Sequence, residues 1–198
     1  MRTYTISPVK NAIDWTSVPT LPIDVQLWGT QTDITAQAQL CYDQDALHIR
    51  LQATEAHIRA EENGPLGAPC RDSCLEFFFC PMEGDRRYFN IEFSPTGCFY
   101  LGFGTDRYDL VRLIPEGTLF TPQILRTETG WEISYSIPFS FIRRFFPDFS
   151  AEPGKGIRAN FYKCGDLTVN EHYLCWNPIT QEKPDYHLSQ FFAPLYFG

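Results

Sequence analysis

Two segments decide the fold of this chain: Asp72-Ser-Cys-Leu-Glu-Phe-Phe-Phe-Cys80 and Tyr88-Phe-Asn-Ile-Glu-Phe93. Large apolar side chains recur in both with a period of two residues, which is the pattern of a β-strand. Between them lie Pro81, Gly84 and Asp85, residues that favour turns. The two segments are therefore predicted to pair as a hairpin.

The hairpin places its polar residues on one parity. Glu76, Asn90 and Glu92 occupy even-numbered positions, whereas the odd-numbered positions hold Leu75, Phe77, Phe79, Phe89, Ile91 and Phe93. A carboxylate at mid-strand among phenylalanines is costly unless it meets solvent or a partner. The pattern predicts a sheet face that carries acids and an amide, backed by an aromatic wall, and we expect the functional site there.

Further strand-like runs, separated by turn residues, continue on both sides of the hairpin. These runs are residues 34–42, 46–53, 98–103, 108–114, 120–126, 131–137, 157–163, 173–176 and 193–197. Helix is expected only as a turn or two at 140–146, capped by Ser140, where three phenylalanines would close one end of the fold. Many short strands with little helix predict an all-β fold, an antiparallel β-sandwich of immunoglobulin-like or jelly-roll type, in one domain spanning residues 1–198.

Two long irregular stretches interrupt the strands, at residues 55–71 and 177–190. The first leads directly into the Glu76 strand, and the second follows Trp176. Extended loops on a rigid sheet scaffold commonly carry binding residues. We therefore expect both stretches to border the site.

Charge and hydropathy exclude some functions. The formal net charge is −8 and no basic stripe is present, which argues against nucleic-acid binding. No apolar run approaches the roughly 18 residues of a membrane span, so no membrane partner is expected. The N-terminus lacks the pattern of a signal peptide, which predicts a cytoplasmic protein if Met1 is the native start. The sequence leaves the oligomeric state open.

The chain has seven cysteines, and an odd number without a signal peptide predicts free thiols in a reducing compartment. Two zinc sets are conceivable, but neither has the spacing of a structural zinc knuckle, and small apolar packing is the favoured role. The two sets are Cys70, Cys74 and Cys80, and Cys164, His172 and Cys175.

No cofactor is expected, although calcium has weak candidates. Hard cations prefer clustered oxygen ligands, and Asp43, Asp45 and Asp72 supply carboxylates. The segment Asp43-Gln-Asp45 also has the composition of a plain turn, which is the favoured interpretation.

Several segments together resemble a known family. Beside the two hairpin segments, these are Ala46-Leu-His-Ile-Arg50 and the run from Trp131 to Phe139. They are similar to the family-nine carbohydrate-binding modules, members of the DOMON-like β-sandwich superfamily. The later segments look like a subgroup of stand-alone family-nine-like proteins, so the resemblance covers nearly the whole chain.

The resemblance implies a β-sandwich that binds sugars without cleaving them. Members appended to hydrolases of xylan and cellulose hold a sugar, often a reducing end, between two aromatic rings, and some bind structural calcium. By this resemblance Glu76 stands at the acidic position, Asn90 at a polar strand position and Tyr186 near the C-terminal clamp aromatic. The upstream clamp aromatic is missing, because the chain has Pro69-Cys-Arg71 there. Either Trp176 or another ring compensates, or the protein does not bind sugar in the family's way.

The predicted function is non-catalytic binding of a mono- or oligosaccharide on the polar sheet face. Trp176 also fits a place in the core, which is its favoured interpretation. One alternative is a glycoside hydrolase that uses Glu76 and Glu92, and another is an interaction module with a vestigial sugar cleft. The predicted carbohydrate-binding residues are Glu76, Asn90, Glu92, Arg107, Trp176 and Tyr186.

Overall fold

The computed structural model describes residues 1–10 and 12–198 of the chain, and it is an all-β structure. The strands are β1 (Tyr4–Pro8), β2 (Leu21–Ile23), β3 (Val25–Gly29), β4 (Thr35–Tyr42), β5 (Ala46–Thr54), β6 (Cys74–Cys80), β7 (Tyr88–Phe93), β8 (Phe99–Gly104), β9 (Val111–Arg112), β10 (Gln123–Arg126), β11 (Gly130–Pro138), β12 (Gly156–Gly165), β13 (His172–Cys175) and β14 (Ala193–Phe197). The helical segments are α1 (Phe139–Arg143) and the 3₁₀ turns η1 (Pro69–Arg71) and η2 (Ser189–Phe191).

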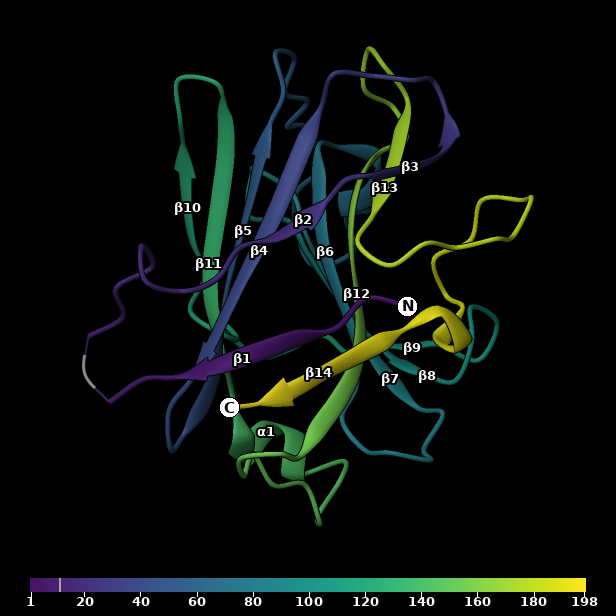
Figure 1. The fold of residues 1–198 in the computed structure, drawn as a ribbon. Helices are drawn as coiled ribbons and strands as arrows, with labels where there is room; N and C mark the ends of the chain where they lie inside the picture. Colours follow the sequence, from purple (N-terminus) through teal and green to yellow (C-terminus); the bar gives the residue numbers. More distant parts are fainter. Residues whose placement is uncertain (11) are drawn as a thin grey trace.

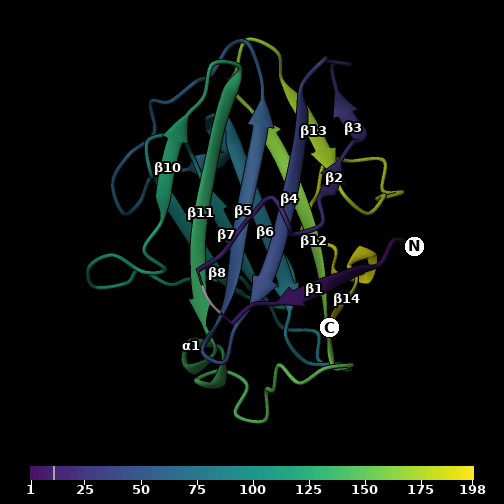
Figure 2. The ribbon, with the colours of Figure 1, turned by 60° about the vertical axis from the view of Figure 1, so that its left-hand side comes forward.

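The strands form one curled sheet whose two halves face each other. Its order is β10-β11-β5-β4-β1-β14-β12-β6-β7-β8-β9, with β2 added beside β4, and with β13 and β3 added beside β12. Figure 1 shows β1 and β14 joining the halves, and Figure 2 shows β11, β5 and β4 lying in front of β6 and β7. For reference, the half that contains β12, β6 and β7 is called the β6 half.

The sheet is mixed, so the expectation of a purely antiparallel sandwich needs correction. Strand β1 pairs in parallel with both β14 and β4. No hairpin joins β1 to either neighbour, so no tight turn imposes an antiparallel direction. Strands β1, β2 and β3 were not among the predicted runs, because none of them shows a long alternation.

The main core lies between the two halves of the sheet. Leu75, Phe77 and Phe79 of β6 point into it. Phe77 stacks on Phe79 and on Phe161 of β12, with ring centroids 4.8 Å apart in both pairs. The period-two alternation of β6 thus places its phenylalanines of odd number in the core, as the sequence predicts.

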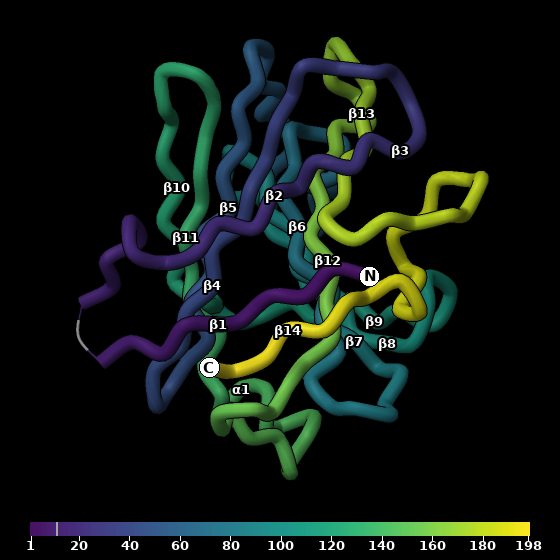
Figure 3. The backbone as a smooth tube through the Cα atoms, viewed as in Figure 1, coloured from purple at the N-terminus to yellow at the C-terminus, as the bar shows by residue number. Residues whose placement is uncertain are grey.

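The opposite face of the β6 half is covered as well. Phe78, Tyr88 and Tyr162 belong to a second buried cluster on this outer face. Tyr186 and Phe192, from the segment that leads into β14, pack on the same cluster. Figure 3 traces this yellow segment from β13 back to β14. The polar face predicted for the hairpin is therefore a buried surface under a loop, not an open one.

The end of the fold near α1 is closed by aromatic rings, as predicted. Phe89 contacts Phe141, Phe145 and Phe146 at centroid distances between 5.1 and 5.9 Å. The predicted cap is wrong, because α1 begins one residue before Ser140 and makes no side-chain cap. Within the described residues, no helix has the length and apolar character needed to cross a membrane.

The predicted run at residues 108–114 contains only the two-residue strand β9. The preceding residues form a loop because aspartate side chains bind its backbone. Asp109 accepts hydrogen bonds from the amides of Thr105 and Asp106, and Asp106 accepts one from the amide of Tyr108. Such local bonds compete with sheet pairing.

Candidate functional site

A cavity of about 210 Å³ opens on the outer face of the β6 half. Strands β6, β7 and β12 form its floor, and the segment at residues 184–187 forms one wall. We call it the outer cavity. Its lining consists of Trp28, Cys70, Glu76, Phe78, Glu92, Arg107, Cys164, Asp166, Tyr173, Pro184, Asp185, Tyr186 and His187.

Two carboxyl groups lie side by side on the floor. Strand pairing places Glu76 of β6 directly opposite Glu92 of β7, and both are largely buried, 2% and 8% exposed. Burial raises the pKa of Glu92 to about 7. Burial raises the pKa of Glu76 well above its usual range, and the neighbouring Glu92 carboxyl adds to this rise. Both shifts favour retention of a proton on the pair, and a carboxyl pair with one proton offers both a hydrogen-bond donor and acceptors.

Hydrogen bonds from two neighbours orient this pair. The side-chain amide of Asn90 donates to Glu92 Oε1 over 3.0 Å, and the Cys164 thiol donates to Glu76 Oε1 over 2.9 Å. Asn90 Oδ1 is buried and has no hydrogen-bond partner among the described residues. Asn90 thus belongs to the floor network without lining the cavity itself.

Aromatic rings form the wall above the carboxyl pair. Trp28 of β3 lies 5.7 Å from the ring of Tyr186 and 6.0 Å from that of Tyr173. Its indole N–H donates to the carbonyl of Gln181 over 2.8 Å, which holds the ring in place. Tyr186 is only 7% exposed and stacks on Tyr162 at 4.0 Å, so Trp28 is the more accessible ring.

An ion pair spans the mouth of the outer cavity. Arg107, from the loop after β8, lies with its Nε 3.3 Å from Asp185 Oδ1. Arg107 is half exposed, so this pair contributes little to stability. It does place a guanidinium and a carboxylate at the rim, where each can bind a polar ligand group.

The structure brings most of the predicted site residues together. Glu76, Glu92, Arg107 and Tyr186 line the outer cavity, and Asn90 lies beside it. Trp176 is not a residue of this site, and its favoured interpretation as a core residue is confirmed, because its ring lies in the main core against Phe161 and is 2% exposed. Trp176 directly follows β13, and the alternation of side chains along the strand points its ring between the two halves of the sheet, away from the outer cavity.

Sequence reasoning missed the accessible ring, Trp28. The run from Val25 to Trp28 is apolar enough to indicate a short strand, but no local signal says which sheet it joins. Strand β3 reaches the cavity only because it pairs with β13. Tyr173, on β13 itself, was placed in a predicted strand without a role in the site.

The calcium candidates do not form a cation cage. Asp43 Oδ1 accepts hydrogen bonds from the amides of Asp45 and Ala46, which confirms the turn interpretation. Asp72 is fully buried and bonded to Arg59 and to backbone amides. In the described part of the chain, these aspartates belong to no cluster with metal-binding geometry.

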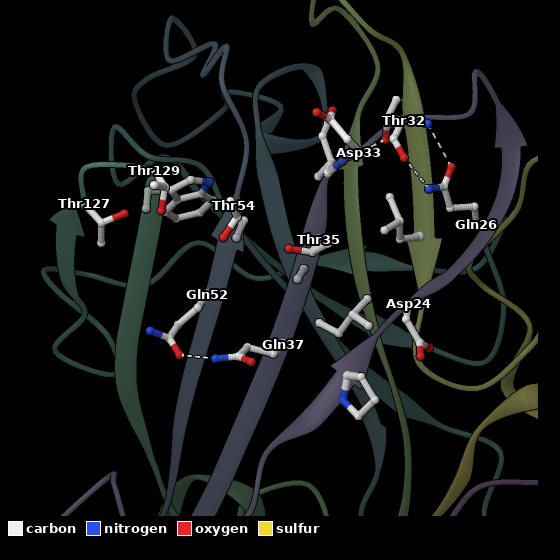
Figure 4. A pocket seen from close by; sticks show the side chains of 17 residues that line it. Asp24, Gln26, Thr32, Asp33, Thr35, Gln37, Gln52, Thr54, Thr127 and Thr129 are labelled. Carbon is white, nitrogen blue, oxygen red and sulfur yellow. Dashed lines mark hydrogen bonds between the residues drawn. The ribbon is translucent and has the colours of Figure 1, made fainter.

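A larger cavity, of about 560 Å³, lies near the start of β4. Figure 4 shows threonine and glutamine side chains around it, with Gln37 and Gln52 hydrogen-bonded to each other at 2.7 Å. The aromatic residue in its described lining, Trp131, is fully buried. This cavity therefore lacks an accessible aromatic ring such as Trp28, and of the two we consider the outer cavity the candidate site.

A buried ion pair lies in the core behind the outer cavity. Lys163 Nζ is 3.3 Å from Glu55 Oε1 and 2.8 Å from His172 Nε2, and all three side chains are almost completely buried. His172 Nδ1 lies 2.6 Å from the carbonyl of Asn170, so this nitrogen carries the proton and Nε2 accepts from lysine. Burial, and then the lysine charge, lower the pKa of His172 to about 4.

This lowered pKa predicts an acid-dependent loss of stability. In the unfolded chain His172 takes up a proton near its ordinary pKa of about 6.5. In the folded protein the same side chain takes up a proton only near pH 4. The contribution of neutral His172 to the free energy of unfolding is therefore complete above pH 6.5 and is lost as the pH falls toward 4. Between pH 7 and pH 5 we expect His172 to account for a loss of about 1–2 kcal/mol.

Replacement of His172 by glutamine, whose side-chain oxygen can still accept from Lys163, should remove this loss. Urea unfolding at pH 7 and pH 5 measures it. The exposed His57 provides the control His57→Gln, which should keep the wild-type loss. Other titrating groups are common to all three proteins and cancel in the comparison. Equal losses in wild type and His172→Gln would contradict the prediction.

Solved structures of other proteins share the fold of this chain. A candidate carbohydrate-binding protein from Bacteroides uniformis is 25% identical, with a TM-score of 0.84 over 100% of this chain and 99% of that one. A family 9 carbohydrate-binding module from Caldicellulosiruptor kristjanssonii in complex with glucose has a TM-score of 0.69 at 11% identity, covering 100% and 96%. The same organism's module in complex with cellotriose has a TM-score of 0.67 at 12% identity, covering 99% and 93%.

Sequence comparison gives the family. No curated protein matches the chain. The profile described as carbohydrate-binding family 9 matches residues 7–197, nearly the whole sequence. This match confirms the resemblance carried by the hairpin segments, and the chain belongs to carbohydrate-binding family 9.

Proposed function

We propose that the outer cavity binds the terminal ring of a neutral mono- or oligosaccharide without cleaving it. One observation carries this proposal: a single cavity unites the Glu76–Glu92 carboxyl pair with a guanidinium and an accessible indole ring. Carbohydrate binding needs this combination, because ring C–H groups stack on aromatic faces while hydroxyls bind carboxylates, amides and arginine. Structures of similar fold that contain glucose and cellotriose support the choice of ligand class.

The size of the outer cavity favours one sugar ring over a chain segment. Its volume of about 210 Å³ is below the roughly 300–1,000 Å³ of pockets that enclose drug-sized ligands. A long chain would have to extend past Arg107 and Asp185 at the mouth. We therefore infer recognition of a chain end, with the carboxyl pair binding hydroxyls and Trp28 covering one face of the ring.

Isothermal titration with glucose, xylose and their oligosaccharides tests the proposal. We expect at least one sugar to bind, and affinity to change little as the chain is lengthened, because only the terminal ring enters. Trp28 should report binding by a change in fluorescence, since Trp131 and Trp176 are buried in the core. No heat and no fluorescence change with any sugar up to millimolar concentration would count against the proposal.

The hydrolase alternative remains testable with the same protein. Glu76 and Glu92 are cross-strand neighbours, and such pairs can meet the separation of about 5 Å needed by retaining glycosidases. We expect no turnover of chromogenic aryl glycosides. Turnover that disappears in Glu76→Gln would favour the hydrolase instead.

A further inference from the structure

Two cysteines and a glutamate meet at the floor of the outer cavity, which Glu76 and Cys164 line and Cys74 does not. Cys74 of β6 stands directly opposite Cys164 of β12, and Glu76 follows two residues along on the same face. The sulfur atoms and a carboxylate oxygen all lie within 4.8 Å of one another, and Cys164 Sγ is 2.9 Å from Glu76 Oε1. Neither zinc set considered from the sequence contains this combination, because it draws one cysteine from each set.

We propose that Cys74, Cys164 and Glu76 bind a thiophilic divalent cation of the zinc class. Two sulfur ligands and one carboxylate oxygen are a donor set that zinc accepts, whereas calcium and magnesium prefer oxygen alone. In a tetrahedral zinc site, bond lengths near 2.3 Å to sulfur and 2.0 Å to oxygen separate the ligand atoms by about 3.5–3.8 Å. Small side-chain rotations suffice to reach this spacing from the present one.

The surroundings of Glu76 favour a cation over simple packing. Its carboxyl group is 2% exposed and has no arginine, lysine or histidine partner in residues 1–10 and 12–198. Glu92 stands directly opposite Glu76 on β7, and Asp166 lines the same cavity. A buried acid among other acids is costly, and a bound cation would remove that cost.

The outer cavity gives this site access and an open position. Glu76 and Cys164 both line the cavity, so a cation can reach them from solvent. Three protein ligands leave the fourth tetrahedral position free toward the cavity, where water or a ligand hydroxyl can enter. The site shares Glu76 with the proposed sugar site but does not depend on sugar binding.

Cys80 provides a matched control. It stands on the same strand and the same face as Cys74 and is equally buried, at 1% exposure. It belongs to no metal-binding cluster in the described part of the chain. If the cation binds to Cys74, Cys164 and Glu76 and not to buried thiols in general, Cys80→Ala will leave cation binding unchanged.

Cobalt titration of chelator-treated, reduced protein tests the proposal. We expect one equivalent of Co²⁺ to give thiolate charge-transfer absorption and the intense visible bands of a tetrahedral site, and Zn²⁺ to displace it. Cys74→Ala and Cys164→Ala should each weaken Zn²⁺ binding by at least about 100-fold, the upper end of the loss caused by removing an outer-shell partner. Thermal unfolding monitored by circular dichroism verifies that each variant is folded.

The absence of a thiolate band on addition of Co²⁺ to folded wild-type protein would overturn the proposal. Bands that persist unchanged in Cys74→Ala and Cys164→Ala, or that vanish equally in Cys80→Ala, would also overturn it. Sugar titration of the same chelator-treated protein is a separate measurement. Failure of the cation site and failure of the sugar site are thereby distinguished.

Discussion

Replacing Lys163 with methionine is expected to lower the free energy of unfolding by about 3–5 kcal/mol. Lys163 is fully buried, and its Nζ is the cation nearest to the buried carboxylate of Glu55, at 3.3 Å. Methionine fills a similar volume but leaves that carboxylate without a positive partner. Trp131 and Ser73 still donate hydrogen bonds to it, at 2.9 and 2.8 Å, so the fold should persist at reduced stability. Urea unfolding at pH 7 measures the difference.

Two further variants identify the cause of this loss. Lys155→Met removes an exposed lysine and should change stability by no more than about 0.5 kcal/mol. The double variant Glu55→Gln/Lys163→Met removes both charges, and should recover part of the loss because no unpaired buried charge remains. If the free energy of unfolding of Lys163→Met lay within about 1 kcal/mol of the wild-type value, the Lys163–Glu55 pair would not be a major stabilising contact.

The buried pair also lies next to the part of the β6 half on which the site is built. Lys163 lies on β12 immediately before Cys164, which lines the outer cavity. Its side chain points to the core while that of Cys164 points outward, because neighbours on a strand alternate. The ion pair therefore fixes the backbone that carries part of the cavity floor.

Local pattern was sufficient to predict the hairpin and its polar face. Strand β7 has the bounds of its predicted segment, and β6 occupies Cys74–Cys80 of the segment that starts at Asp72, because alternation and turn residues act over a few positions. The same alternation correctly placed Glu76, Asn90 and Glu92 on one face. Local pattern could not predict the parallel pairing of β1, because its partners β4 and β14 are distant in sequence.

Burial of that face could not be predicted in the same way. Phe78 and Tyr88 share the parity of the acids, and they bind a loop that returns from almost 100 residues later in the chain. Tyr186 lines the outer cavity, but its stacking on Tyr162 depends on tertiary contact. Contacts of this kind depend on how distant segments pack, which a single sequence pattern does not record.

Trp28→Ala is expected to weaken sugar binding by about 5- to 70-fold. A sugar ring that covers about 50–100 Å² of the indole gains roughly 1–2.5 kcal/mol at about 25 cal/mol per Å². The neighbouring Tyr186 is buried between Trp28 and Tyr162, so it offers little replacement surface. Isothermal titration with the tightest-binding sugar found for wild type measures the loss. Trp28→Phe, which retains a ring, should lose no more than a few-fold.

Trp15→Ala provides the matched control, because Trp15 is a partly exposed tryptophan outside the lining of the outer cavity. It should bind sugar as wild type does. The comparison also separates the two proposals, since Trp28 contributes no metal ligand and its removal should leave cobalt binding intact. If Trp28→Ala binds sugar with wild-type affinity, the stacking surface lies elsewhere. The missing upstream clamp aromatic would then have no substitute on β3, and the outer cavity would have to bind sugar by hydrogen bonds alone.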